Sequence, residues 1–174
     1  AKKSIVLSTF DLRPDDSGTK IIAALYTAAE RGVQVQILID GIYQKLFLEK
    51  SPVFQALAAH QNIEVGIYNP VTNLMRLNYR MHDKYLIIDE SMYLMGGRNT
   101  NDIFLGDKKT RINVDRDIFV YEETQGKGES LQALEKYFDT IWNEAQVRKK
   151  KKTYAASYEE KYKSEYHQLK ERYR

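Results

Sequence analysis

Two hydrophobic periods alternate along the first part of the chain. Short apolar runs rich in β-branched residues are typical of buried strands, and they occupy residues 4–10, 33–39 and 63–68. Between these runs apolar residues recur at helical spacing, which predicts helices at 18–32 and 52–60. The resulting strand–helix–strand–helix–strand order predicts an α/β fold with parallel strands and covering helices.

The pattern changes after Pro70. It predicts three further strands, at residues 81–89, 92–95 and 117–122. A long loop separates the last two, and an amphipathic helix is expected over residues 129–147. The apolar face of that helix consists of Leu131, Leu134, Tyr137, Phe138, Ile141 and Trp142. We therefore expect a mixed, largely parallel sheet that is flanked by helices on both faces.

The last part of the chain has a different character. Residues 148–152 are an unbroken basic run, and aromatic residues then recur every four positions. The stripe consists of Tyr154, Tyr158, Tyr162 and Tyr166, continued by Leu169 and Tyr173. We divide the chain into a domain at 1–147 and a basic, tyrosine-striped helical tail at 148–174. The tail either docks on the body or a neighbour, or lies on an anionic lipid surface.

Charge is distributed unevenly over the 174 residues. The tail contains ten Lys or Arg and four Asp or Glu, whereas the body contains 17 and 20, a net charge of −3. A nuclease body is usually basic along its groove, because phosphate contacts dominate nucleic-acid affinity. This distribution argues against nucleic acid as a partner. The absence of cysteine excludes disulfides and thiolate metal sites.

The segment with the most informative chemistry begins at His82. In an extended segment His82 and Lys84 lie two residues apart and project from the same face. Lys84 favours the neutral, nucleophilic form of the imidazole and also attracts a phosphate. Asn99 follows a Gly-Gly turn and can donate a further hydrogen bond. A nucleophile with clustered donors suits transfer at phosphorus.

The spacing H-x-K-x4-D, followed by x6-G-G-x-N, resembles the signature of the phospholipase D superfamily. The third signature residue is Asp89. The family more usually has serine where Gly97 stands, so a possible hydroxyl contact is missing. A wider similarity, over residues 4–147, is to the first half of bacterial cardiolipin synthases.

The resemblance implies roles for these residues. His82 would attack phosphorus or protonate the leaving alcohol, while Lys84, Asn99 and Gly97 would bind the phosphate. Asp89, on the opposite strand face, would organise the turn before the next strand. No metal and no cofactor are implied.

The family also orients its histidine with a carboxylate that precedes a strand. We expect Asp117 to fill this role and to lie within hydrogen-bonding distance of the His82 ring, with Asp115 as the second candidate. The other histidines are expected to have no catalytic role. His60, for example, ends a predicted helix, where a cationic side chain suits the helix dipole.

A phosphohistidine mechanism needs two imidazoles, and this chain has one such motif. The second would come from another half in the same polypeptide or from a homodimer mate. We favour the first, because the chain starts abruptly at Ala1 and continues past residue 147. The resemblance then implies a bacterial phosphatidyltransferase or phospholipase D that acts on phospholipids, at the membrane or on its cytoplasmic face.

Two alternatives remain open. The first is a homodimeric endonuclease with a single motif in each chain. The second is a domain that binds lipid phosphate but has lost catalysis.

Overall fold

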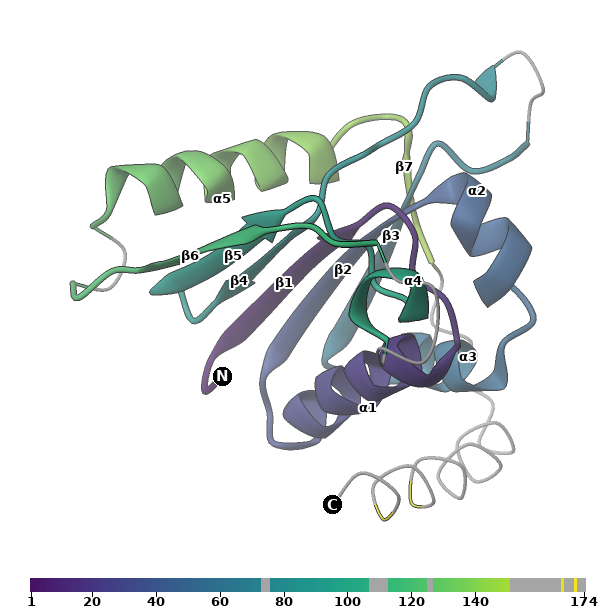
Figure 1. The fold of residues 1–174 in the computed structure, drawn as a ribbon, viewed down its shortest axis with the longest axis horizontal. Coiled ribbons are helices and arrows are strands. Elements are labelled where there is room, and N and C mark those ends of the chain that lie inside the picture. The colour runs from purple at the N-terminus through teal and green to yellow at the C-terminus, as the bar shows by residue number, and fades with distance from the viewer. Residues whose placement is uncertain (73–75, 107–112, 125–126, 151–166, 168–170, 172–174) are drawn as a thin grey trace.

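The computed structural model describes residues 1–72, 76–106, 113–124, 127–150, 167 and 171, and shows a seven-stranded sheet between two layers of helices (Figure 1). The strands are β1 (Ser4–Thr9), β2 (Gln34–Asp40), β3 (Ile63–Tyr68), β4 (Tyr85–Ile88), β5 (Met92–Gly96), β6 (Asp117–Tyr121) and β7 (Val147–Lys149). The helices are α1 (Asp16–Glu30), α2 (Gly41–Tyr43), the π-helical turn η1 (Gln44–Leu48), α3 (Pro52–Ala59), α4 (Asp102–Leu105) and α5 (Glu129–Trp142). The spatial order of the strands is β6-β5-β4-β1-β2-β3-β7.

The predicted α/β fold with helices on both faces is confirmed. Helices α1 and α3 lie on one side of the sheet and α5 lies on the other (Figure 1). Side chains of β1 alternate between these layers: Ile5 and Leu7 pack toward α1 and α3, while Val6 packs toward α5. The sheet therefore separates two hydrophobic cores.

The sheet is mixed, as predicted, although its antiparallel pairings outnumber the parallel ones. The pairs β1–β2 and β2–β3 are parallel, but the other four pairings in the described residues are antiparallel. The tight connection between β4 and β5 reverses the chain through Asp89 and Glu90, whose φ angles are 54° and 51°. A connection this short can join only antiparallel neighbours.

The sheet also extends into residues that we assigned to the tail. Helix α5 ends at Trp142 rather than at residue 147, and β7 then pairs antiparallel with β3. Lys149 lies over the Trp142 ring and donates a hydrogen bond to the Trp142 carbonyl at 2.7 Å. The first basic residues after Val147 are thus part of the fold. The tyrosine stripe at residues 154–173 lies outside the described residues.

Candidate active site

A buried carboxylate fixes the backbone just before His82. Asp40, at the end of β2, is fully buried and accepts hydrogen bonds from the Met81 N–H at 3.1 Å and the Ile42 N–H at 2.9 Å. Arg80 forms an ion pair with it at 3.2 Å. Burial raises the pKa of Asp40, and these hydrogen bonds and Arg80 oppose the rise. This anchor was not predicted from the sequence. It holds residues 81–84 outside the strand expected at 81–89, since β4 begins only at Tyr85.

His82 and Lys84 do project together. The Lys84 Nζ atom lies 3.1 Å from the His82 Nδ1 atom and donates to the His82 carbonyl at 2.6 Å. The Phe10 ring packs against the imidazole with 4.6 Å between centroids, and the Lys84 ammonium lies 5.2 Å from the same ring. Lys84 is buried while His82 is exposed. The imidazole is therefore held from one side and open to a ligand on the other.

This contact determines which imidazole nitrogen carries a proton. An ammonium is only a donor, so the Nδ1 atom of His82 must accept, and a neutral ring then carries its proton on Nε2. Such a ring can donate a proton to a leaving group. To act as a nucleophile at Nε2, it must first move the proton to Nδ1 and find an acceptor for it there.

The expected hydrogen bond between His82 and Asp117 is not made in the described part of the chain. Asp117 instead accepts from Arg98 Nε at 2.6 Å and forms an ion pair with Arg98 Nη2 at 2.5 Å. In the β5–β6 register Asp117 lies opposite Gly96, so its carboxylate is directed at the same loop that carries Arg98. Both guanidinium nitrogens contact the same carboxylate oxygen, Oδ2, and such charge-assisted contacts are strong, so they hold the side chain toward Arg98.

Asp115, the second candidate, acts on Lys84 through its charge. Its side chain fills the space beside Gly97, where any other residue's Cβ would collide with it. Burial lowers the pKa of Lys84, and the charges of Asp83, Asp115 and Asp11 oppose this lowering. Gly97 therefore leaves room for the Asp115 carboxylate, and its contact with phosphate stays a prediction.

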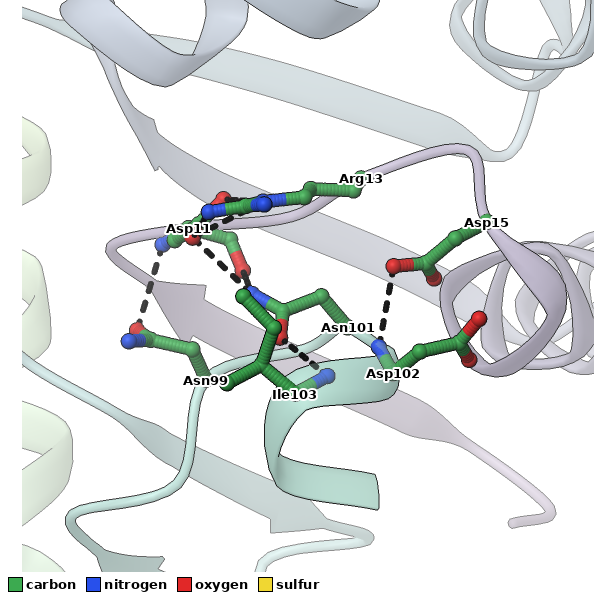
Figure 2. Close-up of polar contacts among 7 residues, drawn as sticks. All are labelled: Asp11, Arg13, Asp15, Asn99, Asn101, Asp102 and Ile103. Carbon is green, nitrogen blue, oxygen red and sulfur yellow. Dashed lines mark hydrogen bonds and ion pairs between the residues drawn. The ribbon is translucent and has the colours of Figure 1, made fainter. Parts of the chain in front are cut away.

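Asn99 is oriented by a loop at the other end of the sequence. Its Oδ1 atom accepts a hydrogen bond from the Asp11 backbone N–H at 3.3 Å, and the residue is buried. Figure 2 shows its amide nitrogen turned away from Asp11. Because the oxygen is already used, the nitrogen remains to donate to a ligand.

Asp11 is the centre of the network that holds this loop (Figure 2). Its buried carboxylate accepts hydrogen bonds from Arg13 and, at 2.9 Å, from Asn101 Nδ2. A second clamp joins the same segments, because the Asp102 N–H donates to Asp15, the N-cap residue of α1, at 2.9 Å. The loop after β1 and the segment that begins at Asn99 therefore behave as one unit.

We expect Asp11→Asn to disturb Asn99 without touching the substrate. Loss of the charged acceptor should lower the free energy of unfolding by about 1.5–3 kcal/mol. Misplacing the Asn99 amide should lower kcat/KM of the complete enzyme by about 10–10²-fold. Asp16→Asn is the control, since Asp16 is exposed and pairs with Lys20 on the surface of α1. Equal losses in both variants, by denaturation and steady-state kinetics, would contradict a positioning role.

Asp89 lies at the far end of β4 from Lys84. Its carboxylate accepts hydrogen bonds from the N–H groups of Lys2, Lys3 and Ser4, at 2.7–3.0 Å. Although burial opposes ionisation, these three N–H groups lower the pKa of Asp89. The third signature residue therefore ties the start of β1 to the end of β4 and does not face the phosphate site.

Asp89→Ala should consequently lower the free energy of unfolding and leave kcat unchanged. Because the pKa is lower in the folded state, the stabilisation is present above the unfolded-state pKa and is lost as pH falls through the folded-state pKa. Thermal unfolding should show a loss of about 1–2 kcal/mol at neutral pH that shrinks in acid. The kcat of the folded fraction should equal that of the unsubstituted enzyme. A large fall in kcat would place Asp89 in the active site after all.

The described residues contain no group of three His, Asp or Glu side chains arranged to hold a metal ion. Of the helices that the structure describes, none combines the length and apolar character needed to cross a bilayer.

Comparison with known proteins yields a family match over most of the chain. Residues 1–142 match the family described as "Cardiolipin synthase, PLD-like domain". Cardiolipin synthase C of Escherichia coli (strain K12) is 30% identical over 133 residues, 68% of this chain and 27% of that protein. A cardiolipin synthase of Clostridium perfringens is 33% identical over 145 residues, 83% of this chain and 29% of that protein. The chain thus spans less than a third of these relatives.

Solved structures share the fold. Nuc from Salmonella typhimurium, a phospholipase D family member, superposes with a TM-score of 0.59 at 20% identity and covers 87% of this chain and 84% of Nuc. NucT from Helicobacter pylori gives a TM-score of 0.59 at 18% identity, with coverage of 84% and 82%. These two proteins are close to this chain in length, unlike the cardiolipin synthases.

Proposed function

This chain belongs to the phospholipase D superfamily, in the family of cardiolipin synthase-like domains, and on that premise we propose that it forms one half of a phosphatidyl-transfer site. The observation that carries the proposal is the cluster of His82, Lys84 and Asn99 side chains. An exposed imidazole adjoins a buried ammonium, and the side-chain nitrogen of a fixed amide has no acceptor among the described residues. These groups suit a phosphodiester anion.

The reaction that we propose has two steps. The Nε2 atom of His82 attacks phosphorus, the bond to the leaving alcohol oxygen breaks, and that oxygen takes a proton from a second imidazole. The acceptor alcohol or water then attacks phosphorus and gives its proton to the second imidazole, and the bond between phosphorus and His82 breaks. Lys84 and Asn99 stabilise the charge on the non-bridging oxygens.

Substrate binding would also allow the His82 ring proton to move from Nε2 to Nδ1. A bound phosphate offers the Lys84 ammonium a better acceptor than the imidazole, so Nδ1 becomes free to carry the proton. Asp115, rather than Asp117, is then the carboxylate that we propose as its acceptor, since Asp117 is held by Arg98. The orienting role therefore moves by two residues along the chain.

The second imidazole can come from either of two arrangements. The cardiolipin synthases are long enough for a second domain of this size, because this chain matches less than a third of them. Nuc and NucT are matched over most of their length, which favours the alternative of two identical copies. We prefer the first arrangement, in which the partner is another half of the parent polypeptide.

Phospholipid is the substrate class that we favour over nucleic acid. The family match is to cardiolipin synthases, and the body of the chain has a net charge of −3. An extended polyanion is poorly held by a body of that charge. The membrane surface, where such substrates lie, is then a partner of the complete enzyme.

The test is turnover by the isolated chain across a dilution series, with mass measured by light scattering. We expect almost no hydrolysis of phosphatidylglycerol vesicles from a monomer, because one imidazole cannot both attack and protonate. If the chain dimerises, activity should appear with the dimer and fall on dilution. Robust turnover by a monodisperse monomer would disprove the two-imidazole mechanism.

Cleavage of plasmid DNA in preference to lipid would favour the endonuclease alternative. Phospholipid binding without turnover, unchanged by His82→Ala in the complete enzyme, would favour the binding domain.

A further inference from the structure

A cavity of about 320 Å³ lies between α1 and the face of the sheet formed by β1, β4 and β5. Its size falls within the range of about 300–1,000 Å³ that is usual for small-molecule sites. Aliphatic side chains make up most of its wall, chiefly Ile5, Leu7, Leu25, Leu86, Ile88 and Leu94. We call this space the α1 cavity.

One end of the α1 cavity is polar and coincides with the candidate phosphate site. Lys84 and Asn99 both line it there, beside the ion pair between Arg98 and Asp117. That pair cancels its own charge. Lys84 has no carboxylate within ion-pair distance in the described residues, so the polar end keeps a positive charge for an anion.

We propose that the α1 cavity holds the first part of one acyl chain of the phospholipid whose phosphate binds at Lys84 and Asn99. This proposal rests on the proposed function and specifies its substrate. Such a phospholipid has an anionic phosphate at one end and a hydrocarbon chain at the other. The α1 cavity offers the complementary groups, the Lys84 ammonium at its polar end and aliphatic side chains along its wall. A nucleotide has no such chain, and its sugar and base would lose hydrogen bonds to water against these walls.

Ala24 offers a way to close the cavity without disturbing the core. It lines the α1 cavity but is exposed on α1, so a phenylalanine there can fill the space without replacing a buried side chain. Glu30→Phe is the matched control, because Glu30 is also exposed on α1 and does not line the cavity.

The experiment is calorimetric titration of the full chain with lysophosphatidylglycerols of increasing chain length, below their critical micelle concentrations. Each methylene that enters the α1 cavity should tighten binding by about fourfold, until the cavity is full and the affinity levels off. Ala24→Phe should remove this dependence and leave binding of glycerophosphoglycerol, the headgroup alone, unchanged. Glu30→Phe should behave like the unsubstituted chain.

The same chain-length slope in Ala24→Phe as in the unsubstituted chain would overturn the proposal. So would a change from dimer to monomer caused by Ala24→Phe in light scattering, since the cavity would then receive a second copy. Failure of the proposed function has a different signature. In that case lysophosphatidylglycerols would bind no better than uncharged monoacylglycerols of equal length, whatever their slope.

Discussion

His82→Ala is expected to lower turnover of the complete enzyme by at least about 10⁴-fold. General acid–base catalysis alone contributes about 10²–10⁴-fold, and this substitution also removes the nucleophile. The variant should still bind phospholipid, because Lys84 and Asn99 remain in place. Single-turnover kinetics with vesicles, together with trapping of a phosphorylated protein, measure both effects. A phosphorylated intermediate that survives in His82→Ala would show that another residue attacks phosphorus.

His60→Ala is the matched control. The His60 ring packs edge-on against Tyr26 with 5.0 Å between centroids, and its Nδ1 atom accepts from the Asn62 N–H at 3.1 Å. These are structural contacts at the end of α3, away from the phosphate site. The control should lose some stability and keep its kcat. Comparable losses of turnover from both substitutions would mean that the nucleophile has been misplaced.

Lys84→Met should have the second largest effect. Removing one preorganised donor to a developing oxyanion commonly costs about 10²–10³ in kcat, and Lys84 supplies the cation that the site directs at phosphate. Methionine keeps most of the aliphatic stem that lines the α1 cavity, so the loss should reflect the charge. Steady-state kinetics on phosphatidylglycerol vesicles should show the fall mainly in kcat. A kcat within about threefold of the unsubstituted enzyme would contradict the assignment.

The same substitution should not weaken the fold. Burial lowers the pKa of Lys84 in the folded state, so the folded chain binds this proton less readily than the unfolded chain does. Stability of the unsubstituted protein should therefore rise as pH increases through the lowered pKa toward the unfolded-state value. Denaturation of Lys84→Met across that range should lack this rise. A retained rise would show that another group titrates.

The sequence predicted the parts of the fold that depend on local pattern. The strands at 4–10, 33–39 and 63–68 and the first helix follow from the spacing of apolar residues, and each corresponds to an element of the structure. The parallel pairing of β1, β2 and β3 was predicted correctly from the strand–helix–strand order. The antiparallel pairings were not predicted, because periodicity does not record orientation. The signal for β4 and β5 was the short turn at Glu90, which can join only antiparallel strands.

The candidate site was only partly predictable for a similar reason. The closeness of His82 and Lys84 follows from their spacing in an extended chain. Asp40 and Asp11 were missed because each acts across a long separation in sequence, 41 residues to Met81 and 88 residues to Asn99. The ion pair between Asp117 and Arg98, which replaces the expected hydrogen bond to His82, could not be predicted. It depends on the β5–β6 register, which no pattern within either strand specifies.

The two edges of the sheet differ in a way that limits stoichiometry. The outer edge at β7 is only three residues long and carries Arg148 and Lys149 exposed, features that discourage further strand pairing. The edge at β6 exposes Ile118 and Phe119, each by more than 60%. If two chains associate through a sheet edge, β6 is therefore the better candidate than β7. Growth into a filament would need both edges, so association through β6 alone would give a closed pair.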